Sequence, residues 1–204
     1  MPKGSPELAA SRREEIISAC EKLYQTMSFK EITLKEISIE TSFSRPSIYN
    51  YFQTKEEIFL ALMQREYESW AAELTVLCEK NETLSAEGFA GGVARSLEEH
   101  TQLLKLLAMN HYDMEENSRP ERLCEFKVAY GASLDAVRMC LKKFFPETDS
   151  ERFLFVFFPF LFGVYPYSVA TQKQLDAMRD AKMDFRMHSI YEIVYDCVMQ
   201  LLGG

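Results

Sequence analysis

Helix-start signals recur along this chain and constrain its fold more than any other feature. At six places a Ser or Thr is followed three residues later by Glu or Gln, a capping-box pattern that satisfies free backbone N–H groups at the start of a helix. Apolar residues recur every three to four positions after each of them, and alternating strand patterns bounded by turns are absent. The sequence therefore predicts an all-α protein of about nine helices. The six pairs are Ser11/Glu14, Thr33/Glu36, Thr54/Glu57, Ser118/Glu121, Thr148/Glu151 and Thr171/Gln174.

Charge is distributed unevenly over the 204 residues. The whole chain has a net charge of -8, but residues 1–55 carry +1 and the remaining 149 residues carry -9. An acidic chain excludes a general nucleic-acid coat protein, which needs a broadly positive face. Any DNA contact is therefore expected at the N-terminal end of the chain.

The five cysteines are scattered, odd in number and form no C-x-x-C motif. This pattern predicts buried reduced thiols rather than a disulfide framework or a zinc site. The first residues, Met-Pro-Lys-Gly-Ser, lack the apolar region of a signal peptide. We therefore expect a cytoplasmic protein with no bound metal.

One charge-free segment, Phe153 to Gln172, reaches the length of a membrane span. It contains Pro159, Gly163 and Pro166, and no Lys/Arg cluster flanks it to set an orientation. A buried helix over residues 150–168 is the better interpretation. A final helix is predicted over Gln174–Leu202, and residues 84–109 are expected to form two helices, broken near Gly91-Gly92 or near His100.

The segment Thr33–Phe52 has the spacing of a helix-turn-helix, with short helices over about 34–40 and 45–51 joined by three residues. Ile48 and Phe52 are four residues apart, so both can face a core. The polar residues near the opposite side suit a DNA groove, because Arg can bind guanine or phosphate and Asn can bind adenine. These residues are Arg45, Ser47, Tyr49, Asn50 and Tyr51.

Residues 12–63 resemble the TetR family of bacterial transcription regulators. The most specific match is the pattern Tyr49-x-x-Phe52-x-x-Lys55-Glu56. The sequence departs from the family at Ser28, where Gly is usual, and at Thr41-Ser42-Phe43, where Ala-Gly-Val is usual. The other matching residues are Ile16, Ile17, Ala19, Cys20, Leu23, Tyr24, Phe29, Thr33, Leu34, Ile37, Ser44 and Ile58.

The resemblance implies a DNA-binding domain over residues 1–55 and a C-terminal helical domain for ligand binding and dimerisation over residues 56–204. It also implies phosphate contacts for Thr33, Lys35 and Lys55, and packing of Tyr49 and Tyr51 against the DNA backbone. Two alternatives stay open, since Tyr51 could be a half-buried core aromatic and Lys55 a solvated charge near a helix cap. The predicted DNA-contact residues are Thr33, Lys35, Ser44, Arg45, Pro46, Ser47, Tyr49, Asn50, Tyr51 and Lys55.

The C-terminal part carries no catalytic motif: it has no G-x-S-x-G, no H-E-x-x-H and no phosphate-binding glycine loop. We therefore expect no enzyme activity, no catalytic residue and no cofactor. Its many aromatic and Met residues are explained by core packing or by an adaptable apolar pocket. The resemblance favours the pocket, for which the candidate ligand contacts are Trp70, Met109, His111, Phe126 and Tyr130.

The last two predicted helices carry wide apolar stripes, which predict a homodimer through a four-helix bundle. Two recognition helices about 35 Å apart would then bind a palindromic operator. The candidate interface residues are Phe158, Phe162, Tyr191, Val194 and Val198.

The resulting hypothesis is a repressor that a small, largely apolar ligand releases from its operator. One alternative is a DNA binder of the same fold that is controlled by a protein partner or has no small ligand. Another is an all-helical enzyme or lipid-binding module, which the lack of a nucleophile–base pair disfavours.

Overall fold

The computed structural model describes residues 5–109 and 111–203, and this part of the chain contains eleven α-helices and no strand. The predicted all-α class is thus confirmed, with two more helices than expected. The described residues form two compact units, each treated separately below. The N-terminal unit comprises residues 5–65 and 111–129, and the C-terminal unit comprises residues 66–109 and 130–203. The sequence-based division at residue 55 did not anticipate that 111–129 would join the N-terminal residues.

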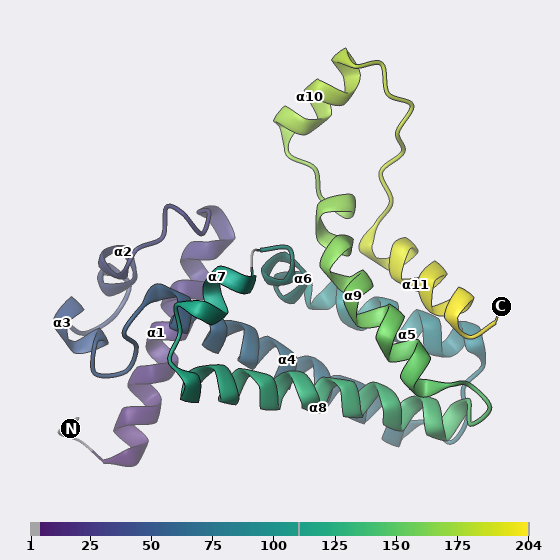
Figure 1. Cartoon of the computed structure of the whole chain (residues 1–204), viewed down its shortest axis with the longest axis horizontal. Coiled ribbons are helices and arrows are strands. Elements are labelled where there is room, and N and C mark those ends of the chain that lie inside the picture. Colours follow the sequence, from purple (N-terminus) through teal and green to yellow (C-terminus); the bar gives the residue numbers. More distant parts are fainter. Residues whose placement is uncertain (1–4, 110, 204) are drawn as a thin grey trace. The chain divides into compact units, whose positions relative to one another are not determined.

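The N-terminal unit is built around isoleucines and aromatic residues that are fully buried, among them Ile16, Ile37, Ile48 and Phe52. Helix α1 packs against α2, and α2 packs against α3. This core holds the helix-turn-helix and the short segment that precedes α8 (Figure 1). Its helices are α1 (Pro6–Thr26), α2 (Leu34–Ile39), α3 (Arg45–Ile48) and α7 (His111–Glu116), with the first parts of α4 (Lys55–Lys80) and α8 (Pro120–Phe144).

The C-terminal unit is organised around α9, whose sequence carries no charge from Phe153 onward because one face of this part is buried. Phe153, Phe157 and Leu161 on this face are 2% exposed or less, and α9 packs on α6 and α11, while α11 packs mainly on α5. A Cβ atom at Gly92 would lie 3.0 Å from Leu77 Cδ2, so this glycine permits close packing rather than breaking α5. The helices are α5 (Ala86–Glu99), α6 (Thr101–Leu107), α9 (Ser150–Ser168), α10 (Gln172–Asp180) and α11 (Ile190–Leu201), with the remainders of α4 and α8.

The single helix predicted over Gln174–Leu202 is wrong, because two local signals divide it. Lys182 has a left-handed backbone (φ 52°), which ends the helical path after α10. Ser189 and Glu192 then form a complete capping box that starts α11. Helix α10 consequently projects away from α9 and α11 (Figure 1), and none of its residues is buried.

The predicted helix starts have mixed outcomes. Thr33 and Thr54 accept backbone N–H groups at the starts of α2 and α4, and Thr171 with Gln174 forms both halves of a capping box. Ser11 instead lies inside α1, which begins at a Ser5 cap. The caps predicted at Ser118 and Thr148 are misplaced as well: α8 begins at Pro120, and Asp149 caps α9.

Membrane-spanning potential is limited to one bent combination. No single helix among the described residues has the length and hydropathy to cross a membrane. Helices α9 and α10 meet these criteria only as a pair, bent by 78° at the break between them.

His100 occupies the break between α5 and α6, which decides between the two break positions that the sequence left open. Its imidazole faces two carboxylates of α4: Nδ1 lies 3.6 Å from Glu66 and Nε2 lies 3.2 Å from Glu73. The polar contact with Glu66, which outweighs the opposing effect of burial, and the charges of both carboxylates raise the pKa of His100 above its ordinary 6.5.

This arrangement predicts a stability difference that depends on pH. The protonated imidazole stabilises the fold fully below about pH 6.5, and the contribution is lost as the pH rises through the raised pKa of the folded protein. Replacing His100 by Gln should therefore destabilise the protein more at pH 5.5 than at pH 8.5 in urea unfolding. The half-exposed His188 supplies the control variant. A His100→Gln effect that is equal at both pH values would contradict the charged interaction.

Candidate nucleic-acid interface

The helix-turn-helix is held by side chains of its own turn. Thr41 Oγ1 donates to the carbonyl oxygens of Ser38 and Phe43, both at 3.1 Å. The backbone N–H and the hydroxyl of Ser42 both donate to the carboxylate of Glu15 on α1. These bonds explain how the turn closes without the usual glycine. The hydrogen bonds of Thr41 stabilise the turn itself, and those of Ser42 attach it to α1.

Most of the predicted contact residues lie on the exposed side of this motif. Arg45 at the start of α3 donates from Nη2 to the Tyr49 hydroxyl at 3.2 Å, so the structure brings these two predicted contacts together. Tyr49 is 48% exposed although it is a large aromatic residue. Ser47 is half-buried. The exposed members of the predicted set are Thr33, Lys35, Ser44, Arg45, Pro46, Tyr49 and Asn50.

Three cations of this region are available to phosphate. Lys30, Lys35 and Arg45 are exposed, and none of them forms an ion pair with another described residue. In contrast, Lys22 of α1 is bound by Glu40 at 2.5 Å. An exposed, unpaired cation can replace a condensed counterion on DNA, which is the main source of binding free energy to a duplex. Positive charge is therefore concentrated where the exposed polar residues are.

Tyr51 does not lie on this surface. Its side chain is 8% exposed, and its ring is 6.4 Å from the ring of Phe43. The residue shares the inner side with Ile48 and Phe52, both fully buried. Of the two interpretations that the sequence left open, the structure places Tyr51 in the core.

Lys55 is bound within the protein. Its ammonium group donates to the carbonyl oxygens of Phe29 at 2.7 Å and Ile32 at 3.2 Å, and lies 4.1 Å from the centre of the Phe29 ring. Lys55 of the family-like pattern thus fastens the loop between α1 and α2 to the start of α4. This role differs from both the phosphate contact and the solvated charge considered from the sequence.

We expect Lys55→Met to lower stability without changing the salt dependence of DNA binding. The lost hydrogen bonds from a charged donor should cost about 1–3 kcal/mol of unfolding free energy. A lost phosphate contact would instead reduce the slope of log K against log salt by about 0.9 per contact. Lys35→Met, which removes an exposed cation, is the matched variant whose slope should fall. A reduced slope for Lys55→Met would show that its ammonium group turns to phosphate on DNA.

The candidate ligand residues are divided between the two units. Trp70, Met109 and Tyr130 belong to the C-terminal unit, and His111 and Phe126 belong to the N-terminal unit. Trp70 is completely buried, and its Nε1–H donates to the Ser96 hydroxyl at 3.0 Å. Tyr130 lies between two aromatic rings, at 5.5 Å from Tyr67 and 5.6 Å from Phe158.

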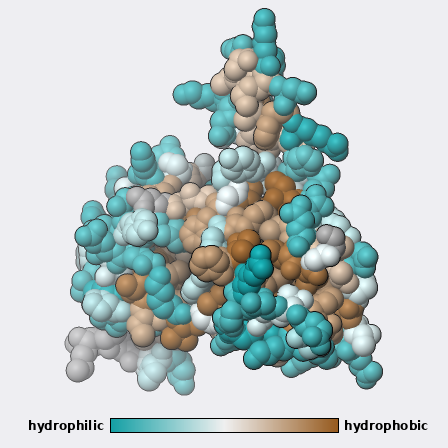
Figure 2. Space-filling view, turned by 45° about the vertical axis from the view of Figure 1, so that its right-hand side comes forward, coloured by the Kyte–Doolittle hydropathy of each residue, from teal (hydrophilic) through white to brown (hydrophobic). Residues whose placement is uncertain are grey.

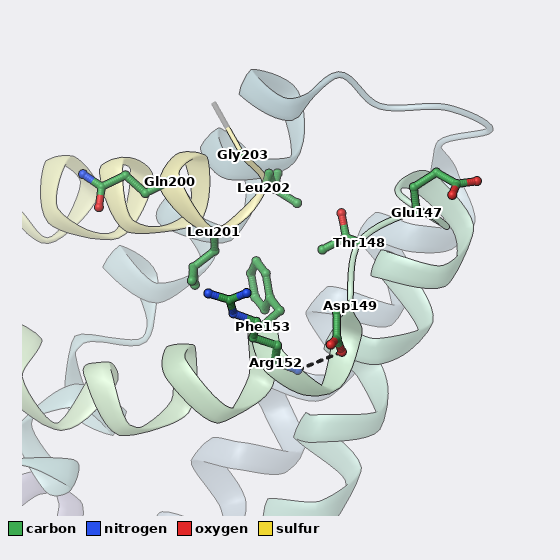
Figure 3. A pocket seen from close by; sticks show the side chains of 9 residues that line it. All are labelled: Glu147, Thr148, Asp149, Arg152, Phe153, Gln200, Leu201, Leu202 and Gly203. Atoms are coloured by element: carbon green, nitrogen blue, oxygen red, sulfur yellow. Dashed lines mark hydrogen bonds between the residues drawn. The ribbon is translucent and has the colours of Figure 1, made fainter.

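A surface hollow of about 400 Å³ lies where the start of α9 meets the end of α11 (Figure 3). The side chain of Arg152 lies beside Phe153 and Leu201 in this hollow, and the backbone N–H of Arg152 donates to Asp149 at 3.0 Å. Acidic, basic and apolar side chains are mixed in its lining, so this hollow does not select one class of ligand.

Three of the five predicted interface residues lie in the core of a single protomer. Phe158 is 2% exposed, and Val194 and Val198 are completely buried. These side chains already pack against their own chain, which leaves them no surface for a partner. Phe162, with 39% exposure, and the half-buried Tyr191 remain accessible.

Most of the chain matches two known sequence families. Residues 16–62 match the family described as "Bacterial regulatory proteins, tetR family", and residues 64–190 match "Tetracyclin repressor-like, C-terminal domain". The HTH-type transcriptional regulator YfiR of Bacillus subtilis is 32% identical over 63 residues, which are 31% of each chain. The HTH-type transcriptional repressor Rv1474c of Mycobacterium tuberculosis is 28% identical over 72 residues, or 35% of this chain and 38% of the relative. The chain thus matches about a third of the length of these curated relatives.

Solved structures share the fold over nearly the whole chain. The fatty acid degradation regulator FadR from Bacillus halodurans has a TM-score of 0.60 and 18% identity, with 100% of this chain and 98% of that chain covered. FadR from Bacillus subtilis in complex with stearoyl-CoA has a TM-score of 0.59 and 16% identity, with 94% and 98% covered. The two family matches together extend from residue 16 to residue 190 and include the exposed helix-turn-helix. The chain therefore belongs to the TetR family of DNA-binding transcription regulators, and it is not an enzyme.

Proposed function

We propose that this protein is a homodimeric repressor that occludes a promoter in the cytoplasm and leaves its palindromic operator when a small, largely apolar ligand binds. The observation that carries the proposal is the exposed surface of the helix-turn-helix, where Lys35, Arg45 and Asn50 combine charge with base-reading side chains. A single helix of four residues, Arg45–Ile48, offers too few contacts for a specific site. Two copies in a symmetric dimer combine their affinities on a palindrome.

An uncharged stripe on the outer face of α9 supports dimerisation. Phe155 is 81% exposed, Phe162 is 39% exposed and Tyr167 is 65% exposed, a large apolar area for a surface helix. A Cβ atom added to Gly163 would meet nothing within 4 Å, so a second helix can approach closely there. Figure 2 shows hydrophobic side chains gathered on the face below the projecting segment. We therefore assign the dimer surface to this stripe, which includes Phe162 of the predicted set, and to Tyr191 of α11.

A groove beside the stripe adds to the same surface. It has a volume of about 610 Å³ and lies between α8 and α9, with Leu134, Phe155 and Pro159 among its lining residues. Because its lining is mainly apolar and open to solvent, a side chain of a second copy can fill it. An isologous contact would bury this groove on both protomers.

The aromatic cluster of the C-terminal unit supports an apolar effector. Tyr67, Tyr130, Phe158 and Trp70 form a connected series of ring contacts between α4, α8 and α9. The related FadR structure with stearoyl-CoA suggests long-chain acyl compounds as the first class to test. Trp70 is the only tryptophan of the chain, so its fluorescence reports on this cluster alone.

The test combines Trp70 emission with operator binding. Stearoyl-CoA and free coenzyme A are titrated into the protein, alone and in complex with a duplex selected from random sequence by the protein itself. The proposal expects an emission change and release of the duplex with the acyl compound but not with free coenzyme A. If a panel of acyl and aromatic compounds changes neither signal, the alternative of a partner-controlled or ligand-independent DNA binder is favoured.

A further inference from the structure

An ion pair of the N-terminal unit joins the first turn of α4, which follows the helix-turn-helix, to the residue before α8. The carboxylate of Glu57, 1% exposed, accepts from Arg119 Nε at 2.6 Å and from Arg119 Nη2 at 2.9 Å. It also accepts the backbone N–H groups of Arg119 at 3.1 Å and Gln53 at 2.8 Å. Four donors therefore converge on one buried carboxylate, 62 residues away from the arginine in sequence.

Arg119 also binds the segment that directly follows the recognition helix α3. Its Nη2 donates to the carbonyl oxygen of Tyr51 at 3.2 Å, just after the turn that ends α3. The neighbouring Thr54 hydroxyl donates to the carbonyl oxygen of Asn117 at 3.1 Å. The segment 117–119 is thus fastened to residues 51–57 at several points, and Arg119 makes most of these bonds.

The electrostatics of the pair are consistent with a permanently charged link. Burial opposes ionisation of Glu57, but the hydrogen bonds from Arg119 and from the two backbone N–H groups outweigh it and lower the pKa of this carboxyl. The side-chain hydrogen bonds to Glu57 raise the pKa of Arg119. The bidentate geometry also fixes the orientation of the Arg119 side chain relative to Glu57, because the planar guanidinium and the carboxylate meet through two parallel hydrogen bonds.

We propose that Arg119 is a positioning residue for DNA recognition, which sets the orientation of the recognition helix through Glu57 and the Tyr51 carbonyl. Helix α3 has only four residues and cannot fix its own direction. Its start is fastened through the turn to Glu15, and its end is fastened through Arg119. The exposed side chains of Arg45 and Asn50 meet a groove only when both ends are held. Arg119 belongs to no predicted contact set and acts through residues 51–57 rather than by touching DNA.

Arg119→Ala, Arg119→Lys and Glu57→Gln test this proposal on full-length protein, with a duplex selected by the wild type and a scrambled duplex of equal length. We expect Arg119→Ala to lower affinity for the selected duplex at least 30-fold, with the scrambled duplex and the salt slope nearly unchanged. A lost phosphate contact would instead weaken both duplexes and reduce the slope. Arg119→Lys keeps the charge without the paired geometry and should recover part of the loss.

Arg65→Ala is the matched control for a purely structural role. Arg65 also binds two carboxylates in the N-terminal unit, Glu14 and Glu21, and its hydrogen bonds and ion pairs with described residues do not include residues 51–57. All variants are compared at a temperature where circular dichroism shows them folded. Faster amide exchange at Gln53 in Glu57→Gln would show that the segment between α3 and α4 is less firmly held. The proposal is overturned if folded Arg119→Ala binds the selected duplex within threefold of wild type, or if Arg65→Ala loses as much specific affinity.

Discussion

Replacing Arg45 by Ala lowers affinity for the operator by at least 30-fold. The guanidinium is exposed, forms no ion pair with another described residue and is bound only by the Tyr49 hydroxyl, so it is free to bind guanine or phosphate. A guanidinium that binds the edge of a guanine contributes about 1–3 kcal/mol. A symmetric dimer loses this contact twice, which gives about 2–6 kcal/mol. Fluorescence anisotropy on the selected duplex and on a scrambled duplex measures the loss.

Lys22→Ala is a suitable control for Arg45→Ala. Lys22 is an exposed cation of the same unit, but it is already engaged with Glu40 at 2.5 Å. We expect this variant to bind the selected duplex within threefold of wild type. If the Arg45 variant and the wild type bind every duplex with equal affinity, α3 is not part of the DNA interface.

The second large effect concerns the stripe on α9. Phe155→Glu and Phe162→Glu should fold normally, because both side chains are exposed in the protomer. In a dimer, however, each change buries a charge without a partner, at a cost of about 3–5 kcal/mol. We expect the dimer dissociation constant to rise at least 100-fold in sedimentation equilibrium, and operator affinity to fall with it.

Val128→Glu separates a specific interface from a general effect of surface charge. Val128 is 68% exposed on α8 but belongs to neither the stripe nor the groove. This variant should remain dimeric. If both phenylalanine variants also stay dimeric at low micromolar concentration, the dimer surface lies elsewhere on the protomer.

Local patterns were sufficient to predict much of the DNA-binding unit. The cap at Thr33 and the apolar spacing of Ile37, Ile48 and Phe52 depend on residues close in sequence. The same argument placed Arg45 and Asn50 on the exposed side. The helix bounds were less exact, because five residues rather than three separate α2 from α3, and α3 ends at Ile48 rather than near Tyr51. Short-range regularities are visible in a single sequence because helical periodicity fixes which side chains share a face.

Contacts between residues far apart in the chain could not be predicted from these local patterns. Lys55 binds carbonyl oxygens of residues 29 and 32, whose positions depend on the path of a loop. Glu57 looked like the second half of a capping box with Thr54, and only the folded chain brings Arg119 to its carboxylate. A carboxylate does not reveal from its sequence neighbours whether it is exposed or almost completely buried.

The dimer surface illustrates a related limit. Helices α9 and α11 are apolar on more than one side, so periodicity cannot tell which side faces the protomer and which is left exposed. Val194 and Val198 fit the same stripe pattern as Phe162, but they are completely buried within their own chain.

The segment formed by α10 has a consequence for sequence variation. Since no residue of α10 is buried, changing its sequence removes no contact from the hydrophobic core. Insertions, deletions and epitope tags in this excursion should leave the melting temperature of the protomer nearly unchanged. Substitutions in this segment should therefore cost little stability in natural relatives as well.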